Sequence, residues 1–451
     1  MKLKTLKSKN ALLLIFLCLH LVSYSQTLNG SFDSKFKRYQ KSENFTGTAT
    51  LTKNEVAWKG ERVYAQMVLW SSSNQNNLTY EVSDFTDGTN IIPSANTTLM
   101  FSKDVKADPE TRACSSYPSQ RTEVVEIADA LSFTPQSTLD ATNPTKIWLR
   151  LDVPSNTVAG NYSGTIKVKQ SGVEEVNFNL NIEVLNKTLP DQANWNFHLD
   201  LWQYPYQILK HYNDDHPGNE IAIWSQAHFD MFQPYYELLA DAGQKVISAH
   251  IKEGGQGQPS MIKWTLKTNG TWEYDFTAFD KYVDLLTSLG ISKQINCFSP
   301  VGWNGDVLPY YDEATGTNKE LSTPVASAIY DTRWDHFLSA FKLHLDSKGW
   351  FDKSVLFLDE IHESQLLDVI DMITSNNANW KIGLSFFDPP SQEINDAMYD
   401  MSGNLGTASS LGRTNKISTF YTSCAQTIPN NYVTPESNPG EMNWMAWHVA
   451  N

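Results

Sequence analysis

Two adjacent carboxylates, Asp359 and Glu360, follow the apolar segment 354–358. Carboxyl groups catalyse glycoside hydrolysis, but an ordinary retaining pair lies about 5 Å apart on either side of the scissile bond. Neighbouring residues are poorly placed for that arrangement. They suit substrate-assisted hydrolysis, in which the 2-acetamido oxygen of the substrate itself attacks the anomeric carbon. One carboxylate would then orient the acetamido group, and its neighbour would protonate the leaving oxygen.

Two other interpretations of this pair are open at the level of sequence. Asp359 could cap a following helix, with Glu360 as an acid in the first turn, where the helix dipole favours negative charge. Alternatively, Glu360 could work with a distant acid, as in an ordinary retaining glycosidase.

Further candidates for substrate binding lie near the ends of other predicted strands. His198 and Asp200 are two residues apart, so they share one face of a strand predicted over 196–202, either as substrate ligands or as a hydrogen-bonded core pair. Tyr310 and its neighbour Tyr311 are expected on a long loop. Aromatic rings stack on sugars but also fill cores. The remaining candidates are Trp202, His250, Trp303 and Tyr421.

No metal or cofactor is expected. Beyond the leader described below, the cysteines are Cys114, Cys297 and Cys424, which have neither the spacing of metal ligands nor that of a disulfide framework. The glycine-rich segment 253–257 lacks the Lys-Ser/Thr ending of a phosphate-binding loop.

The start of the chain and its charge indicate where it works. Four lysines precede the apolar stretch 11–22, and small residues lead up to Ser25, the pattern of a secretory signal peptide over residues 1–25. We therefore expect a secreted or periplasmic protein, cleaved near Ser25. No later run is apolar enough to insert stably in a membrane. The net charge of −15 argues against a nucleic acid partner, because phosphate binding needs a basic surface.

The 451 residues divide into two regions with different patterns of apolar and polar residues. From 26 to 190, apolar residues alternate with polar ones in short runs, which predicts an antiparallel β-sandwich domain. The clearest strands are expected over 62–70, 146–151, 162–168 and 176–184. The polar segment 155–161 is expected to join the second and third of these as a hairpin.

From 191 to 451, predicted strands alternate with predicted helices, which favours a parallel sheet and, at this length, a (β/α)8 TIM-type barrel. The strands are expected over 196–202, 245–251, 294–298, 354–359, 381–387 and 417–423, with a doubtful one in 401–408. The helices are expected over 225–241, 277–289, 324–345, 364–373 and 441–449. In such barrels the catalytic residues lie at the carboxyl ends of the strands, where the candidates above fall.

Several segments resemble glycoside hydrolase family 123, a β-N-acetylgalactosaminidase family. In the second region they are 197–206, 241–247, 262–264, 270–275, 293–297 and 357–360. In the first they are 58–63, 151–154 and 159–164, which resemble the β-sandwich that precedes the family's barrel. The resemblance implies that Asp359 orients the acetamido group and that Glu360 is the general acid/base. The implied partner is a glycan ending in a 2-acetamido sugar, without a cofactor.

Two departures from the family pattern affect these expectations. Ile361 stands where the family often has proline, and the chain ends at Asn451, before a last strand that the family carries. We therefore expect a C-terminally incomplete barrel in which 196–202 has an unpaired side. The function classes are a secreted glycosidase for terminal β-linked N-acetylhexosamine, or a non-catalytic carbohydrate-binding or inactive truncated relative.

Overall fold

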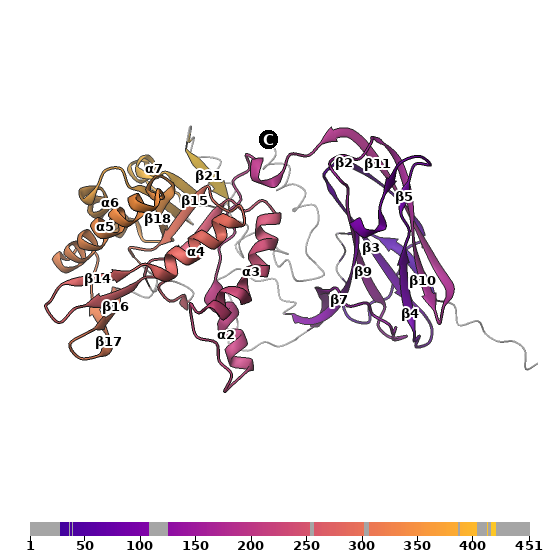
Figure 1. Ribbon diagram of the computed structural model, residues 1–451, viewed down its shortest axis with the longest axis horizontal. Helices are drawn as coiled ribbons and strands as arrows, with labels where there is room; N and C mark the ends of the chain where they lie inside the picture. Colours follow the sequence, from indigo (N-terminus) through magenta and orange to yellow (C-terminus); the bar gives the residue numbers. More distant parts are fainter. Residues whose placement is uncertain are drawn as a thin grey trace, which may run out of the picture. The chain divides into compact units, whose positions relative to one another are not determined.

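The computed structural model describes residues 28–107 (except 36 and 38), 125–252, 257–301, 306–386, 388–403, 413 and 416–420. The described chain forms two compact units, which meet in the sequence between Leu189 and Pro190 (Figure 1). Trp303, Tyr421 and the predicted leader and last helix lie outside the described residues.

The first unit contains two β-sheets that share one hydrophobic core. The first sheet is antiparallel, in the order β1 (Asn29–Asp33), β3 (Arg62–Trp70), β9 (Thr145–Asp152), β7 (Thr97–Ala107) and β8 (Val125–Ser132). The second has the order β2 (Thr52–Lys59), β11 (Val173–Thr188), β10 (Gly160–Gln170), β5 (Phe85–Thr86) and β6 (Ile91–Ile92), and β4 (Leu78–Val82) also pairs with β10. A short 3₁₀ helix, η1, spans Ser94–Asn96.

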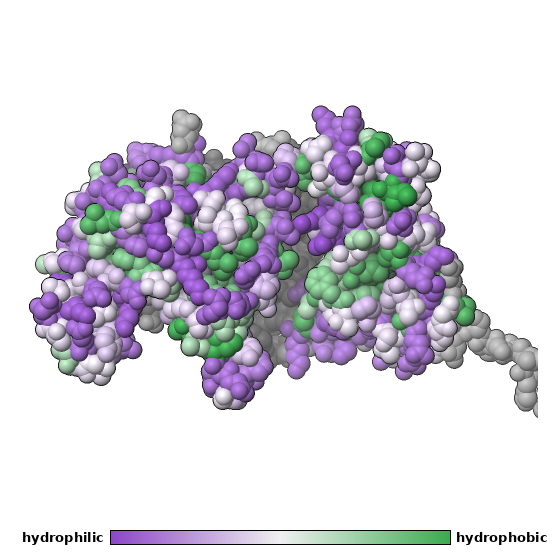
Figure 2. Space-filling view, viewed as in Figure 1, coloured by the Kyte–Doolittle hydropathy of each residue, from purple (hydrophilic) through white to green (hydrophobic). Residues whose placement is uncertain are grey.

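Alternate residues of both sheets fill this core. Leu149 of β9, Ile166 of β10 and Phe178 of β11 are fully buried in one cluster, whereas their sequence neighbours face outward. This is the burial pattern that period-two alternation predicts, and the β-rich character of the region is confirmed. Hydrophilic residues cover much of the face shown in Figure 2, with smaller hydrophobic areas between them.

The hairpin predicted across 155–161 was wrong. β9 pairs with β3 and β7, whereas β10 pairs with β11, β4 and β5 in the other sheet. The segment therefore crosses from one sheet to the other. Its polar composition indicates an exposed connection but does not reveal which strands pair, because that depends on contacts distant in sequence.

The second unit is a mixed α/β fold around a parallel sheet. The strand order is β12 (Val246–His250), β15 (Gln294–Phe298), β18 (Ser354–Asp359), β19 (Lys381–Phe386), β20 (Asp400–Gly403) and β21 (Ile417–Phe420). The described helices are α2 (Pro205–Asp215), α3 (Gln226–Asp241), α4 (Thr277–Ser288), α5 (Ala328–Lys348), α6 (Glu363–Asn376) and α7 (Gln392–Ala397). The described part of this unit also includes the 3₁₀ helices η2 (Gln192–Asn194) and η4 (Phe351–Lys353).

The two faces of this sheet have different partners. Ile295 and Leu356 point to the helices and join a buried cluster with Phe337 of α5. The intervening residues of each strand point to the opposite face. There the side chains of Gln294 and Asp400 form a hydrogen bond of 2.6 Å, although two strands separate β15 from β20. The sheet therefore curls strongly, and we call this the concave face.

The described strands form an open curled sheet, so barrel closure is not shown. The strand predicted over 196–202 was wrong, because this segment makes a single bridge, Leu199 to Gln244. Hydrogen bonds with side-chain amides take the place of the backbone hydrogen bonds that a paired strand would make. Gln203 accepts a hydrogen bond from the backbone N–H of Ser248 (2.7 Å), and Gln244 accepts one from that of Leu201 (2.9 Å).

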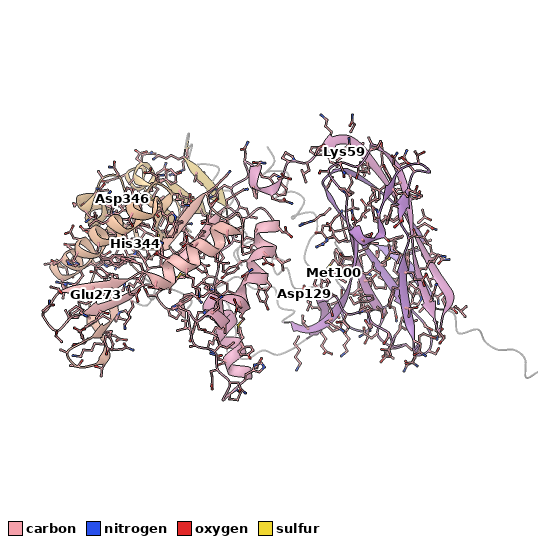
Figure 3. All side chains as sticks on the ribbon, viewed as in Figure 1. Lys59, Met100, Asp129, Glu273, His344 and Asp346 are labelled. Atoms are coloured by element: carbon pink, nitrogen blue, oxygen red, sulfur yellow. The ribbon has the colours of Figure 1, made fainter. Side chains whose placement is uncertain are left out.

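A second, four-stranded sheet arises from the segments that follow β12 and β15. Its order is β14 (Trp272–Asp275), β13 (Lys263–Leu266), β16 (Val307–Asp312) and β17 (Thr317–Ser322). Tyr310 and Tyr311 therefore lie on a strand, and their assignment to a loop was wrong. Glu273 of β14 is exposed (Figure 3). Asn269-Gly270, a typical hairpin turn between β13 and β14, was the sequence signal for this sheet.

Candidate active site

Asp359 and Glu360 lie together at the carboxyl end of β18. Asp359 is the last residue of the strand and half-buried, whereas Glu360 is exposed. The backbone N–H of Glu360 donates to the carbonyl oxygen of Ser385 (2.9 Å), which anchors the pair to β19. Glu360 has φ +47°, a left-handed conformation that costs a non-glycine residue about 1–3 kcal/mol. Such conformations concentrate at functional sites, and this one turns the chain sharply between the two acids.

The helix-capping interpretation of the pair was wrong. The next helix, α6, begins at Glu363, and its N-cap residue is His362. The acid in its first turn is therefore Glu363, and neither member of the pair occupies a capping position. Helix capping therefore does not account for the presence of two adjacent carboxylates at the end of β18.

Alternation along β18 places Asp359 on the concave face, two positions beyond Phe357. The ring of Phe357 packs with Phe298 of β15, with centroids 5.2 Å apart. Trp202 contacts both rings edge-on, at 5.2 Å from Phe298 and 6.3 Å from Phe357. These three rings form an apolar floor on the face from which Asp359 projects, and the structure brings predicted residue Trp202 to it.

The electrostatic setting of Asp359 differs from that of an ordinary carboxylate. Burial, followed by the negative charge of Glu360, raises the pKa of Asp359 to about 6, and a hydrogen bond with Ser385 partly offsets this. Asp359 is therefore mostly ionised at neutral pH but titrates only about one pH unit below it.

Tyr204 is a member of this site that sequence reasoning missed. Its ring centroid lies 6.3 Å from that of His250, which stacks on Phe298 at 5.6 Å. Burial raises the pKa of Tyr204 well above its usual value, and the charges of Asp359 and Asp200 raise it further. The hydroxyl therefore stays protonated. Its position directly before Pro205, which begins α2, was the available signal.

His198 and Asp200 contribute to a polar network on the same face. The amide of Asn296 donates to Asp200 (3.0 Å), and the amide of Gln294 donates to Asn296 (2.7 Å) as well as to Asp400. His198 Nε2 lies 3.7 Å from Asp400 Oδ2. The structure thus brings both residues to this network, although they do not share the face of a paired strand. Gln294 and Asn296, polar at alternate positions of an apolar strand, carried a sequence signal, whereas Asp400 did not.

Several buried polar atoms on this face have no hydrogen-bond partner within the described ranges. They belong to Ser248 and, just beyond the end of β15, to Ser299, each less than a tenth exposed, and Asp200 Oδ1 is another. Burial lowers the pKa of His250 to about 4, against the opposing effect of a hydrogen bond with the backbone of Gln203, so its ring is neutral and keeps one nitrogen as an acceptor. Because buried polar groups normally have partners, these atoms are available to hydrogen-bond a polar molecule bound on the concave face.

Tyr310 is placed differently from the other predicted residues. Its ring packs against Trp272, with centroids 5.1 Å apart, at the border of the hydrophobic cluster under the second sheet. This contact assigns it a packing role in the described structure. Its contact with substrate remains a prediction, as do those of Trp303 and Tyr421.

Gly383 of β19 leaves room for Phe357, one of the three rings of the apolar floor. A Cβ at this position would lie 2.4 Å from a ring carbon of Phe357 and 3.0 Å from Val355. We expect Gly383→Ala to lower the free energy of unfolding by about 1–3 kcal/mol, as overpacking does. Urea denaturation measures this. Phe357→Leu should relieve the clash, so the double variant should lose less than the two single losses together; additive losses would contradict the packing argument.

Asp200 provides a second test of the concave face. Burial, then the charge of Asp400, raises its pKa to about 7, above the value near 3.9 of an unfolded chain. The folded protein thus binds more protons between these values and loses stability as pH rises. At pH 8 we expect Asp200→Asn to raise the free energy of unfolding by roughly 1–3 kcal/mol. Urea denaturation would show this as a higher midpoint, and the gain in stability should vanish toward pH 4.

The matched control is Asp368→Asn, which changes an exposed carboxylate on α6. It should leave the pH dependence of stability unchanged. If Asp200→Asn raised the free energy of unfolding equally at pH 4 and pH 8, the folded structure would not be disfavouring the ionised form of Asp200.

The described residues contain no cluster of three or more potential metal ligands. Among the helices of the described ranges, none is long and apolar enough to span a membrane.

Both units of the chain match families of known proteins. Residues 202–451 match the family described as the catalytic domain of glycoside hydrolase 123, and residues 30–170 match the glycoside hydrolase 123 N-terminal domain. No curated protein matches the chain. A family 123 glycoside hydrolase from Clostridium perfringens, described for glycolipid glycan hydrolysis, is 27% identical with a TM-score of 0.72, covering 84% of this chain and 67% of its own.

More distant structures are similar in much weaker terms. A putative glycoside hydrolase from Bacteroides vulgatus is 10% identical with a TM-score of 0.27, covering 78% of this chain and 60% of its own. A family 39 glycoside hydrolase from Bacteroides cellulosilyticus is 10% identical with a TM-score of 0.28, covering 82% and 57%. At these scores they carry no argument about this chain.

Proposed function

The chain belongs to glycoside hydrolase family 123, and we propose that it removes terminal β-linked N-acetylhexosamine, N-acetylgalactosamine in particular, by substrate-assisted retaining catalysis. The observation that carries the proposal is the placement of Asp359 and Glu360 side by side at the end of β18. Consecutive residues are poorly placed to act from opposite sides of one bond, and a 2-acetamido group of the substrate can supply the nucleophile instead.

The two acids take different roles because their surroundings differ. Half-buried Asp359 accepts a hydrogen bond from the acetamido N–H and stabilises the positive charge that develops as the acetamido oxygen attacks C1 and forms an oxazolinium ring. Exposed Glu360 protonates the departing glycosidic oxygen. It then deprotonates the water that attacks C1 and reopens the ring, so that configuration is retained.

The remaining residues of the concave face would hold the sugar. Trp202 provides an apolar surface for the ring, and His250, Ser248 and Ser299 offer the buried polar atoms that its hydroxyls require. Tyr204, which stays protonated beside Asp359, offers a donor to the acetamido group. His198 and Asp200 complete the polar wall. Trp303, Tyr310 and Tyr421 are proposed contacts on the strength of sequence alone.

The proposal extends to location and architecture. The leader pattern of residues 1–25 supports secretion or a periplasmic location. The strong curl of the parallel sheet, with a contact between β15 and β20 across the concave face, supports a barrel-type catalytic domain over 191–451 that follows a β-sandwich domain over 26–190.

Hydrolysis of three chromogenic glycosides tests the function. We expect the full chain to cleave the β-N-acetylgalactosaminide, with the β-N-acetylglucosaminide as the stereochemical comparison, and to leave the plain β-galactoside almost untouched. Equal turnover of β-galactoside and β-N-acetylgalactosaminide would refute the substrate-assisted mechanism. Binding of these sugars without any hydrolysis would favour a non-catalytic carbohydrate-binding relative.

A further inference from the structure

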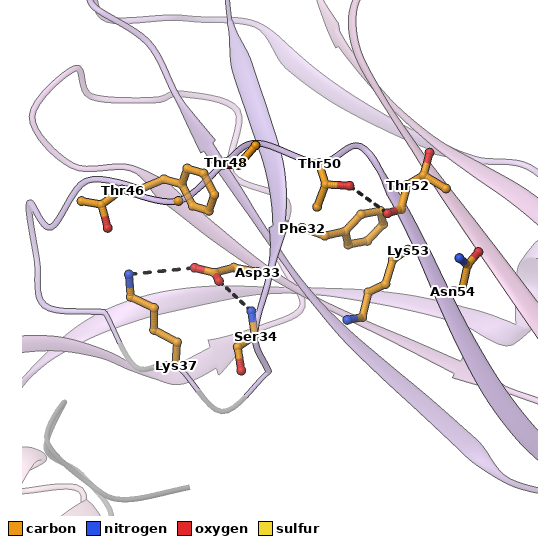
Figure 4. Close-up of a pocket in the computed structure, with 12 residues that line it drawn as sticks. Phe32, Asp33, Ser34, Lys37, Thr46, Thr48, Thr50, Thr52, Lys53 and Asn54 are labelled. Carbon is orange, nitrogen blue, oxygen red and sulfur yellow. Dashed lines mark hydrogen bonds and ion pairs between the residues drawn. The ribbon is translucent and has the colours of Figure 1, made fainter.

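An open groove runs along one edge of the first unit and is lined only by residues of that unit. It has a volume of about 580 Å³ and lies between the end of β1, the segment 45–50 and the start of β2 (Figure 4). Hydroxyl groups dominate one wall, where threonines occupy alternate positions. They are Thr46, Thr48, Thr50 and Thr52.

The groove continues onto the outer face of the second sheet through Asn54, which lines its end. The amide of Asn181 on β11 donates to Asn54 Oδ1 (2.8 Å), and Ser163 of β10 donates to Asn181 Oδ1 (2.9 Å). In the neighbouring row, Thr165 donates to Asn179 (3.2 Å), which is in register with Thr52. We call these two cross-strand rows the amide platform. Their mutual hydrogen bonds hold the side chains in place before any ligand arrives.

The charges around the groove are balanced by neighbours of opposite sign. Lys37 lies 3.2 Å from Glu43, and Lys53 lies 3.2 Å from Glu55. The platform itself carries only neutral amides and hydroxyls. A phosphate-rich or sulfated ligand would therefore meet no unbalanced positive charge here, and the net charge of −15 opposes such ligands further.

The platform also ends in an exposed aromatic ring. Trp58 lies on the outward face of β2, four residues beyond Asn54, and its side chain is 41% exposed. Val56, between them on the same face, is 55% exposed. Two exposed apolar side chains of β2 thus lie in line with the amides.

From these observations we propose that the groove and the amide platform bind an extended, neutral glycan chain, as a site separate from the catalytic one. A glycan presents hydroxyl edges, which amides and threonines can pair, and C–H faces, which stack on an indole ring. Because the platform side chains are already ordered, binding loses little conformational entropy. The inference stands on the first unit alone and does not rest on the proposed reaction.

Affinity electrophoresis of the full chain tests this. Gels would contain soluble galactan, xylan, mixed-linkage β-glucan or glucomannan as neutral probes, and chondroitin sulfate as the anionic probe. We expect retardation by at least one neutral polysaccharide and none by the anionic one. Asn181→Ala and Trp58→Ala should each weaken binding about tenfold, the effect of losing a central contact.

Two exposed control residues elsewhere should leave binding unchanged: Phe133→Ala, matched to Trp58, and Asn219→Ala, matched to Asn181. Cleavage of the chromogenic β-N-acetylgalactosaminide by all four variants should equal that of the parent chain, which also shows that they are folded. Absence of retardation by every neutral polysaccharide, equal binding by the platform variants, or binding only to chondroitin sulfate would overturn the proposal. Failure of the parent chain to cleave the chromogenic substrate would instead count against the proposed function alone.

Discussion

Glu360→Gln is expected to lower kcat/KM by about 10²–10⁴-fold on glycosides with poor leaving groups, the usual contribution of a general acid. The amide matches the carboxyl group in shape but has no proton to donate. With a 2,4-dinitrophenyl leaving group, which departs without protonation, the ring-closing step should be nearly unimpaired. The kcat/KM values of a series of aryl glycosides with graded leaving-group pKa measure this.

The control for Glu360→Gln is Glu363→Gln, three residues along the chain in the first turn of α6. It removes an acid from the same region without touching the site, and we expect at most a small loss of activity. A Glu360→Gln variant whose loss is the same for every leaving group would remove Glu360 from the role of proton donor.

Asp359→Asn should reduce kcat/KM by about 10²–10³-fold for good and poor leaving groups alike, comparable to losing one preorganised electrostatic contact to a transition state. The reason is that acetamide orientation and charge stabilisation are needed whatever departs. Because burial and the charge of Glu360 raise the pKa of Asp359 to about 6, the parent enzyme should lose activity as pH falls through about 6 and Asp359 becomes protonated.

The pH profile of the Asp359→Asn variant is the matching measurement. Its residual kcat/KM should lack the acid limb near pH 6, because the titrating group is gone. A limb that persists unchanged in the variant would assign that ionisation to another residue, and a leaving-group dependence identical to that of Glu360→Gln would contradict the division of roles.

The sequence allowed the chemistry of β18 to be predicted because the signal there is local. An apolar run that ends in two acids predicts a buried strand and an exposed turn, and β18 ends at Asp359 as expected. The positions of α3, α4, β15 and β19 followed from similar local patterns. The separate roles of Asp359 and Glu360 came from the resemblance to the family, because no local sequence pattern distinguishes the two acids.

The errors occur where long-range contacts decide the structure. Segment 196–202 has the alternation of a strand, but the side chains of Gln203 and Gln244 take the hydrogen bonds that a paired backbone would make. Asp400 meets Gln294 only because the sheet curls, and no pattern in the sequence reports that curvature. Tyr204 likewise approaches Asp359 and His250 through the fold of the chain before α2, not through its neighbours in the sequence.

Progressive fluorination of the substrate's N-acetyl group tests the central claim most directly. Each fluorine withdraws electrons from the acetamido carbonyl oxygen and weakens it as a nucleophile, while the leaving group and the rest of the sugar stay unchanged. If this oxygen attacks C1 between Asp359 and Glu360, kcat/KM must fall steeply from the acetyl through the mono- and difluoroacetyl to the trifluoroacetyl substrate. A flat series would contradict the account, because it would show that an enzyme group and not the substrate's acetamide is the nucleophile.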